Sequence, residues 1–251
     1  MSRVQILQRT SSILICLARW CVALGVCLIV SACASVEVEY RFDDDAARIG
    51  EASLWDDWYE TVQRTNDELV DIQACIEDES KCDRDMRRIR RVVINGKKLQ
   101  PEQQLQLVNR YINRMRRYND DRRTYKELED SRLLVAQQWS TLMDFMQKGG
   151  DCEDFATAKY ALLTLIGFDT HDLRIVVVYD QDVQEYHAVI AVRTAEDQVA
   201  LLDIDNKIYA QRPPHYRFVY SINEHSIWDH SLEDTRLPRA LRKRQASNQS
   251  D

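Results

Sequence analysis

The chain has 251 residues, which is enough for one moderate domain and a targeting segment but too few for two full domains. Its content of aliphatic and aromatic residues is ample for a packed core, which excludes an intrinsically disordered protein. The formal charge is −7 and no basic block is large enough to hold a polyanion, so we expect no nucleic acid partner.

Residues 1–33 have the composition of an export signal, with three arginines as the only charges and an apolar run over 20–30. That run is shorter than the ~20 apolar residues of a membrane span. Three fates stay open: lipidation of Cys33 in the lipobox-like Val-Ser-Ala-Cys, ordinary signal-peptidase cleavage, or an uncleaved anchor. Each would place the rest of the chain in the periplasm or cell envelope.

Four of the seven cysteines lie in residues 1–33, which leaves Cys75, Cys82 and Cys152. In an oxidising compartment Cys75 and Cys82 can pair, which makes Cys152 the odd cysteine and a candidate reactive thiol. The alternative is that all three are free and buried. We expect no zinc site, because no CxxC and no histidine pair at ligand spacing is present.

Composition divides the rest of the chain into an acidic linker (34–50), a domain (51–232) and a polar, charged tail (233–251) that we expect to be disordered.

The first half of the domain is predicted to be helical. Apolar residues recur at helical spacing over 52–75 and again from Pro101 to about residue 118, and the stretch 125–146 is predicted to form one or two further helices. The aromatic stripe around Trp58 is best explained as core packing, and the arginine-rich stretch 83–91 as a solvated helical face.

The stretch on which the functional argument depends is Gly149-Gly150-Asp151-Cys152-Glu153-Asp154. An apolar-periodic run follows it up to Gly167, so we expect a helix over 152–166 with Cys152 at its N-terminus. The helix dipole there favours a thiolate, whereas the adjacent carboxylates oppose it. Either some of these carboxylates face away from the thiol, or a cation neutralises them.

A nucleophilic cysteine needs a base and a residue that orients the base. His187 lies in a predicted strand over 186–194, and the next predicted strand, 198–205, carries Asp203 and Asp205. The short connections between these strands imply antiparallel neighbours. We therefore expect an α+β protein, with its helical N-terminal half packed on a small antiparallel sheet.

These motifs resemble those of the bacterial transglutaminase-like cysteine proteinases, and most of all the LapG-type periplasmic proteases that trim large surface adhesins. The resemblance extends over roughly residues 99–228. Its sharpest parts are Gly-Asp-Cys-Glu-Asp-Phe-Ala at 150–156, Ala-Lys-Tyr at 158–160, His187 and Asp205-Asn206, and its weaker parts are Val108-Asn109 with Asn113, Trp139 and 218–228.

The resemblance implies a papain-like core and a Cys152–His187–Asp205 triad that acts through a thioester, with Asp203 as the fallback for the third residue. It also implies calcium as a cofactor, with Asp151 and Glu153 as ligands. It further implies a protein substrate such as an adhesin, and an inner-membrane regulatory receptor. Two other functions stay open: transglutaminase or amidase chemistry on the same core, and a non-catalytic, lipid-anchored binding module.

Overall fold

The computed structural model describes residues 40, 42, 47–115, 118–119, 124–128, 131–135, 139–194 and 198–230, with only the backbone described for 124–128 and 131–135. The predicted export signal (1–33) and tail (233–251) lie outside these residues. None of the helices in the described ranges is long and apolar enough to cross a membrane.

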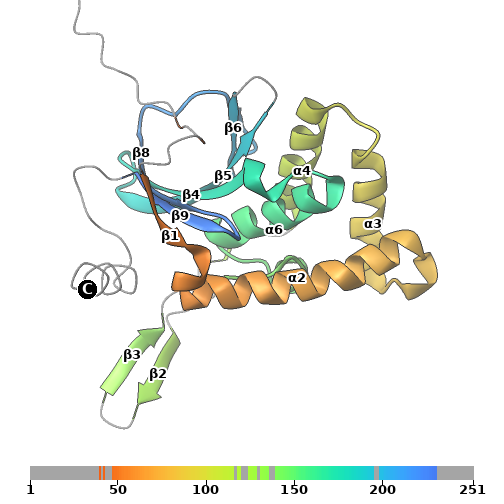
Figure 1. Cartoon of the computed structure of the whole chain (residues 1–251), viewed down its shortest axis with the longest axis horizontal. Coiled ribbons are helices and arrows are strands. Elements are labelled where there is room, and N and C mark those ends of the chain that lie inside the picture. The colour runs from red at the N-terminus through yellow and green to blue at the C-terminus, as the bar shows by residue number, and fades with distance from the viewer. Residues whose placement is uncertain are drawn as a thin grey trace, which may run out of the picture. The chain divides into compact units, whose positions relative to one another are not determined.

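The described chain has a helical first half followed by a strand-rich second half (Figure 1). The helices are α2 (Asp56–Glu77), α3 (Arg84–Gly96), α4 (Pro101–Met115), α5 (Leu142–Lys148) and α6 (Cys152–Ile166), with short 3-10 turns at Ala52–Leu54, Glu79–Lys81 and Thr170–Asp172. The strands are β1 (Arg48–Glu51), β2 (Thr124–Leu128), β3 (Ser131–Val135), β4 (Leu173–Asp180), β5 (Glu185–Arg193), β6 (Val199–Leu202), β7 (Ile208–Tyr209), β8 (Tyr216–Ile222) and β9 (Ser226–Asp229).

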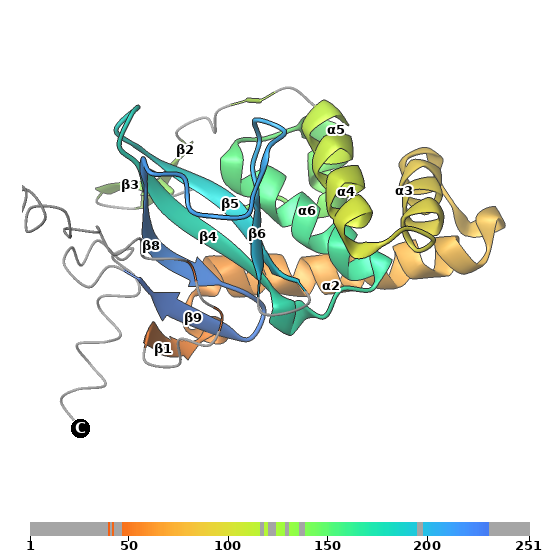
Figure 2. The same cartoon turned by 90° about the horizontal axis from the view of Figure 1, so that it is seen from above.

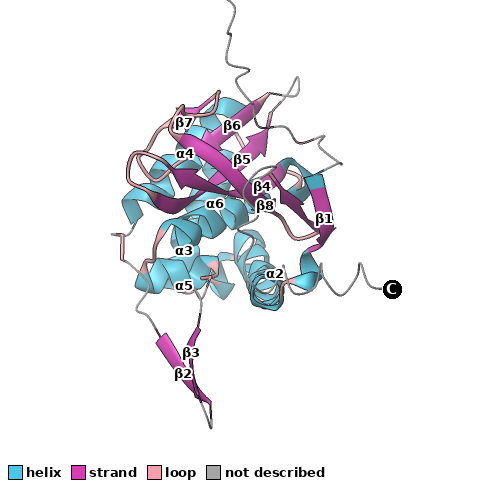
Figure 3. Cartoon of the chain, turned by 90° about the vertical axis from the view of Figure 1, so that its left-hand side faces the viewer, coloured by secondary structure: helices cyan, strands magenta, loops and turns pink. Residues whose placement is uncertain are grey.

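Seven strands form one sheet in the order β1-β9-β8-β4-β5-β6-β7, and every neighbouring pair in it is antiparallel. The helices and the sheet form separate layers (Figure 3). The predicted α+β class, with a helical N-terminal half on an antiparallel sheet, is therefore confirmed.

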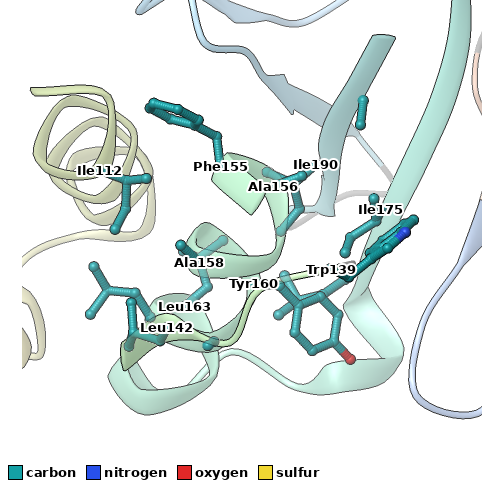
Figure 4. Close-up of a cluster of buried hydrophobic side chains, with 14 of the residues drawn as sticks. Ile112, Trp139, Leu142, Phe155, Ala156, Ala158, Tyr160, Leu163, Ile175 and Ile190 are labelled. Carbon is teal, nitrogen blue, oxygen red and sulfur yellow. The ribbon is translucent and has the colours of Figure 1, made fainter. Parts of the chain in front are cut away.

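Helix α6 is the central element of the helical layer. It lies between strands β4 and β5 on one side and α4 on the other, so nearly all of its residues are buried (Figure 2). Phe155, Ala156 and Ala158 of this helix share a cluster with Ile112 of α4 and Ile190 of β5 (Figure 4). The predicted bounds of α6 are confirmed, and Gly167 ends the helix in the left-handed region at φ 118°.

The second face of the sheet is also covered. Val176 and Val178 of β4 alternate with residues that face the helices, and they pack with Tyr40 and Phe42. Strand β1 in turn pairs with β9. Within the predicted linker 34–50, Tyr40 and Phe42 are buried against the sheet and the residues from Arg48 onward form its edge strand.

The connection from α2 to α3 is cross-linked by the Cys75–Cys82 disulfide, and Cys152 is the one free cysteine in the described ranges. Both features agree with the pairing expected from the sequence. Trp58 is buried, which confirms that the aromatic stripe belongs largely to the core.

Two predicted elements differ from the structure. The sequence predicts helix over 125–146, but β2 and β3 pair with each other as a hairpin, and among the described residues of this stretch only those of α5 are helical. The charged residues there predict a helix through propensity alone, which is a weak guide where a local hairpin can form. Strand β6 ends at Leu202 instead of Asp205, and this difference changes the site.

Candidate active site

Cys152 is the first residue of α6 and follows a tightly folded glycine pair. Gly149 has φ 75°, which favours glycine, and a Cβ on Gly150 would overlap the carboxylate of Asp154. That carboxylate accepts hydrogen bonds from Asp151 N (3.2 Å) and Ser140 N (2.7 Å). The glycines thus let Asp154 hold together the loop that presents the cysteine.

The Cys152 thiol is buried and surrounded by acidic groups. Its Sγ donates to Glu153 Oε2 at 3.2 Å, and it also receives a hydrogen bond from the backbone of Ala188, the residue next to His187. Burial raises the pKa of the Cys152 thiol strongly, and the charge of Glu153 raises it further. Both effects disfavour the thiolate form of the cysteine in this arrangement.

His187 lies near the start of β5, and Asp203 holds its ring. Nε2 of His187 donates to Asp203 Oδ1 at 2.7 Å, and the other carboxylate oxygen of Asp203 accepts from the Tyr216 hydroxyl at 2.7 Å. Burial alone would raise the pKa of Asp203, but hydrogen bonds from His187, Tyr216 and the Ile204 amide outweigh it and hold that pKa below its usual value. Asp203 is therefore a buried, ionised partner for the imidazole.

The contact between Asp203 and His187 corrects the choice of Asp205 as the partner of the histidine. Asp205 is turned toward Lys207 and Tyr209, whose side chains donate to its Oδ2 at 2.7 and 2.8 Å. The choice followed the Asp205-Asn206 motif of the resemblance, but β6 ends before Asp203 and the chain turns through Asn206 at φ 66°. The two carboxylates therefore have different partners.

Asp151 and Glu153, the predicted metal ligands, form a buried carboxyl pair beside the thiol. Burial raises the pKa of Glu153, although a hydrogen bond with the Asp151 side chain partly offsets this. Glu153 Oε1 is buried and makes no hydrogen bond to any described residue. Such a pair of oxygen ligands fits a hard cation, and further oxygens would have to complete its coordination.

A second group of possible ligands, Asp180, Asp182 and His215, lies at the turn between β4 and β5 and is partly exposed. It includes neither Asp151 nor Glu153.

The structure also brings to the site residues to which the sequence analysis assigned no role. Tyr216 contacts Asp203 from β8, and no motif marks it. Asn109 and Asn113 of α4 belong to a weaker part of the family resemblance, which gave them no role, and in the structure they reach the loop between β6 and β7. Lys159 of α6 is buried, and its burial lowers its pKa more than the charges of Asp203 and Asp205 raise it.

The chain is similar to solved structures of a protease. Calcium-bound LapG from Legionella pneumophila matches with a TM-score of 0.51 and 26% identity, over 70% of this chain and 98% of its own. An EGTA-treated structure of LapG from the same organism matches with a TM-score of 0.51 and 25% identity, over 66% of this chain and 88% of its own. A search of curated proteins gave no match.

The model of one protein family, described as bacterial transglutaminase-like cysteine proteinase BTLCP, matches residues 61–236, which include the cysteine helix, the histidine strand and the Asp203 loop. The chain therefore belongs to the bacterial transglutaminase-like cysteine proteinases and is a cysteine peptidase.

Proposed function

We propose that this peptidase cleaves proteins with a Cys152–His187–Asp203 triad. The observation that carries the proposal is the 2.7 Å contact between His187 Nε2 and the buried carboxylate of Asp203. Ala188, the residue after His187 on the same strand, makes a backbone hydrogen bond to the Cys152 thiol. Because Nε2 is committed to Asp203, Nδ1 is the nitrogen that exchanges a proton with Cys152. Asp203 replaces Asp205 in the assignment from sequence.

The reaction that follows is acyl transfer in two stages. His187 takes the thiol proton, the sulfur attacks the peptide carbonyl, and His187 returns the proton to the leaving amine to give a thioester. Water, deprotonated by His187, then hydrolyses the thioester and frees the sulfur. The Cys152 backbone N–H at the start of α6 is a donor for the oxyanion in both stages.

A bound cation answers the electrostatic difficulty at the thiol. We propose that Asp151 and Glu153 hold calcium, in line with the buried, unpartnered Glu153 Oε1 and with the calcium-bound and EGTA-treated LapG structures. Calcium would supply positive charge that offsets the carboxylates and so lowers the pKa of the cysteine. Glu153 would then coordinate the metal instead of accepting a hydrogen bond from the Cys152 thiol.

For the cellular setting we propose a periplasmic or cell-envelope enzyme, lipid-anchored at Cys33, that acts on a surface protein such as an adhesin. An inner-membrane receptor would regulate it. The Cys75–Cys82 disulfide supports an oxidising compartment. The likeness to LapG supports this class of protease.

Alkylation of Cys152 by iodoacetamide tests the triad. In full-length protein with calcium at pH 7, we expect His187→Ala to slow alkylation by about 100-fold, because the base is lost. Asp203→Asn should slow alkylation by roughly 10-fold, which corresponds to a rise of about one unit in the pKa of the thiol. Asp205→Asn is the matched control and should stay within about twofold of wild type. Wild-type rates in both His187→Ala and Asp203→Asn would refute the triad.

Glu153→Gln separates the role of the cation from that of the triad. Without its negative charge the pKa of Cys152 falls, so in excess EGTA this variant should be alkylated about 10-fold faster than wild type. In titration calorimetry, Asp151→Asn and Glu153→Gln should each weaken calcium binding, whereas Asp182→Asn from the separate acidic group should not. Calcium binding that is unchanged in both site variants would exclude these ligands.

A further inference from the structure

The loop between β6 and β7 determines where Asp203 lies. Strand β6 ends at Leu202, and the loop after it is closed by a hydrogen bond from Asp203 N to Lys207 O at 3.2 Å. Since the contact to His187 depends on the position of this short loop, the groups that hold the loop from outside matter for the site.

Helix α4 supplies two such groups, Asn109 and Asn113, which we call the asparagine clamp. Asn113 Nδ2 donates to Asp203 O at 2.7 Å, and Asn109 Nδ2 donates to Lys207 O at 3.0 Å. Asn113 Nδ2 also donates to Asn109 Oδ1 at 3.2 Å, so the two amides support each other across one helical turn. The clamp thus grips both ends of the loop.

The surroundings make this arrangement specific. Asn109 is 1% exposed, and asparagine is a poor helix former whose buried amide is costly unless it is hydrogen-bonded. The neighbouring Val108 and Ile112 pack in the core, so Asn109 is a polar side chain at a buried position of an apolar helix face. The polar atoms of the clamp are directed to the backbone of the loop that carries Asp203.

We propose that Asn109 and Asn113 are positioning residues, which act on the chemistry by fixing Asp203 and, through it, the imidazole of His187. Supporting groups of this kind must hold catalytic groups to within about 0.5 Å, and their loss typically costs activity by about 10-fold or more. This inference rests on the proposed triad, since it requires Asp203 to be its third member.

A double-mutant cycle with calcium present tests the clamp. We expect Asn113→Ala to slow alkylation of Cys152 by about 10-fold and to lower kcat on a protein substrate while KM stays within about twofold. In an Asp203→Asn background the same substitution should change the alkylation rate by less than about twofold, because its effect passes through the missing carboxylate. Asn109→Ala repeats the test at the other end of the loop if Asn113→Ala folds poorly.

Asn223→Ala is the matched control. Asn223 is also a buried asparagine, but it caps the turn between β8 and β9 by accepting from His225 N and Ser226 N. It should lower the melting temperature without changing the alkylation rate of the folded protein. The clamp is refuted if its variants behave like Asn223→Ala, or if they slow alkylation equally in both backgrounds. Should His187→Ala and Asp203→Asn themselves react at the wild-type rate, the triad fails instead.

Discussion

Asp203 and Asp205 lie two residues apart, yet their surroundings give them different tasks. Asp203 is 2% exposed and contacts His187 and Tyr216, whereas Asp205 sits in a more exposed group with Lys207 and Tyr209. Burial raises the pKa of both carboxyls, but hydrogen bonds outweigh burial in each case, so both pKa values lie below their usual range. Only the hydrogen bonds of Asp203 are largely shielded from water, and a shielded hydrogen bond is stronger than an exposed one.

Tyr216→Phe tests the support of Asp203 at the level of one atom. The variant leaves Oδ2 without its donor, so the free energy of unfolding at pH 7 should fall by about 1–3 kcal/mol. Because the hydrogen bond lowers the pKa of Asp203, its stabilisation exists above the unfolded pKa and is lost as the pH falls through the folded pKa. Urea unfolding should therefore show the two proteins converging below about pH 4.

The matched control for this substitution is Tyr209→Phe, which removes the corresponding hydroxyl from Asp205. At that exposed position the change should stay within about 0.5 kcal/mol. An equal loss in both variants would mean that the hydroxyl at Tyr216 has no special value to the buried carboxylate.

Among the elements, those whose ends are set by local sequence could be predicted. Gly149, Gly150 and Gly167 bracket α6, and the apolar period between them gave its bounds as 152–166. The disulfide followed from simple pairing of cysteines in an oxidising compartment. Cys152 and His187 could be singled out because residue type and order along the chain carry the signal.

Elements that end through contacts with distant parts of the chain could not be predicted. The loop after β6 accepts hydrogen bonds from Asn109 and Asn113, about 90 residues earlier, and turns at Asn206. No local pattern could show that Asp203, rather than Asp205, would face His187. Tyr40 and Phe42 likewise pack against a surface that exists only once β4 has paired with β8.

At the scale of the whole molecule, buried charge is concentrated along α6 and the strands beside it. Four charged residues are buried in this region, namely Asp151, Glu153, Lys159 and Asp203. The overall composition is that of an ordinary acidic domain and does not indicate them. Buried charges cost stability unless they are paired. The protein therefore retains groups here that a fold optimised for stability alone would replace with apolar residues.

Lys159 makes this cost measurable. Burial lowers its pKa to about 7, although Asp203 and Asp205 oppose the change. The unfolded chain keeps this proton up to about pH 10.5. Between these values the unfolded state binds more protons, so the contribution of Lys159 to stability rises with pH, by up to about 1.4 kcal/mol per pH unit. Between pH 7 and pH 9.5, the free energy of unfolding should rise more steeply with pH for the protein with Lys159 than for the Lys159→Met variant.

These measurements belong in a Cys152→Ala background, so that the Cys152 thiol cannot attack the Cys75–Cys82 disulfide at alkaline pH. Lys148→Met is the matched control, because Lys148 is exposed and its ion pair with Asp144 is accessible to water. Its curve should run parallel to that of the parent protein. A Lys159→Met curve that also runs parallel would mean that the lysine stays protonated in the fold, with its charge fully balanced by the carboxylates of the loop.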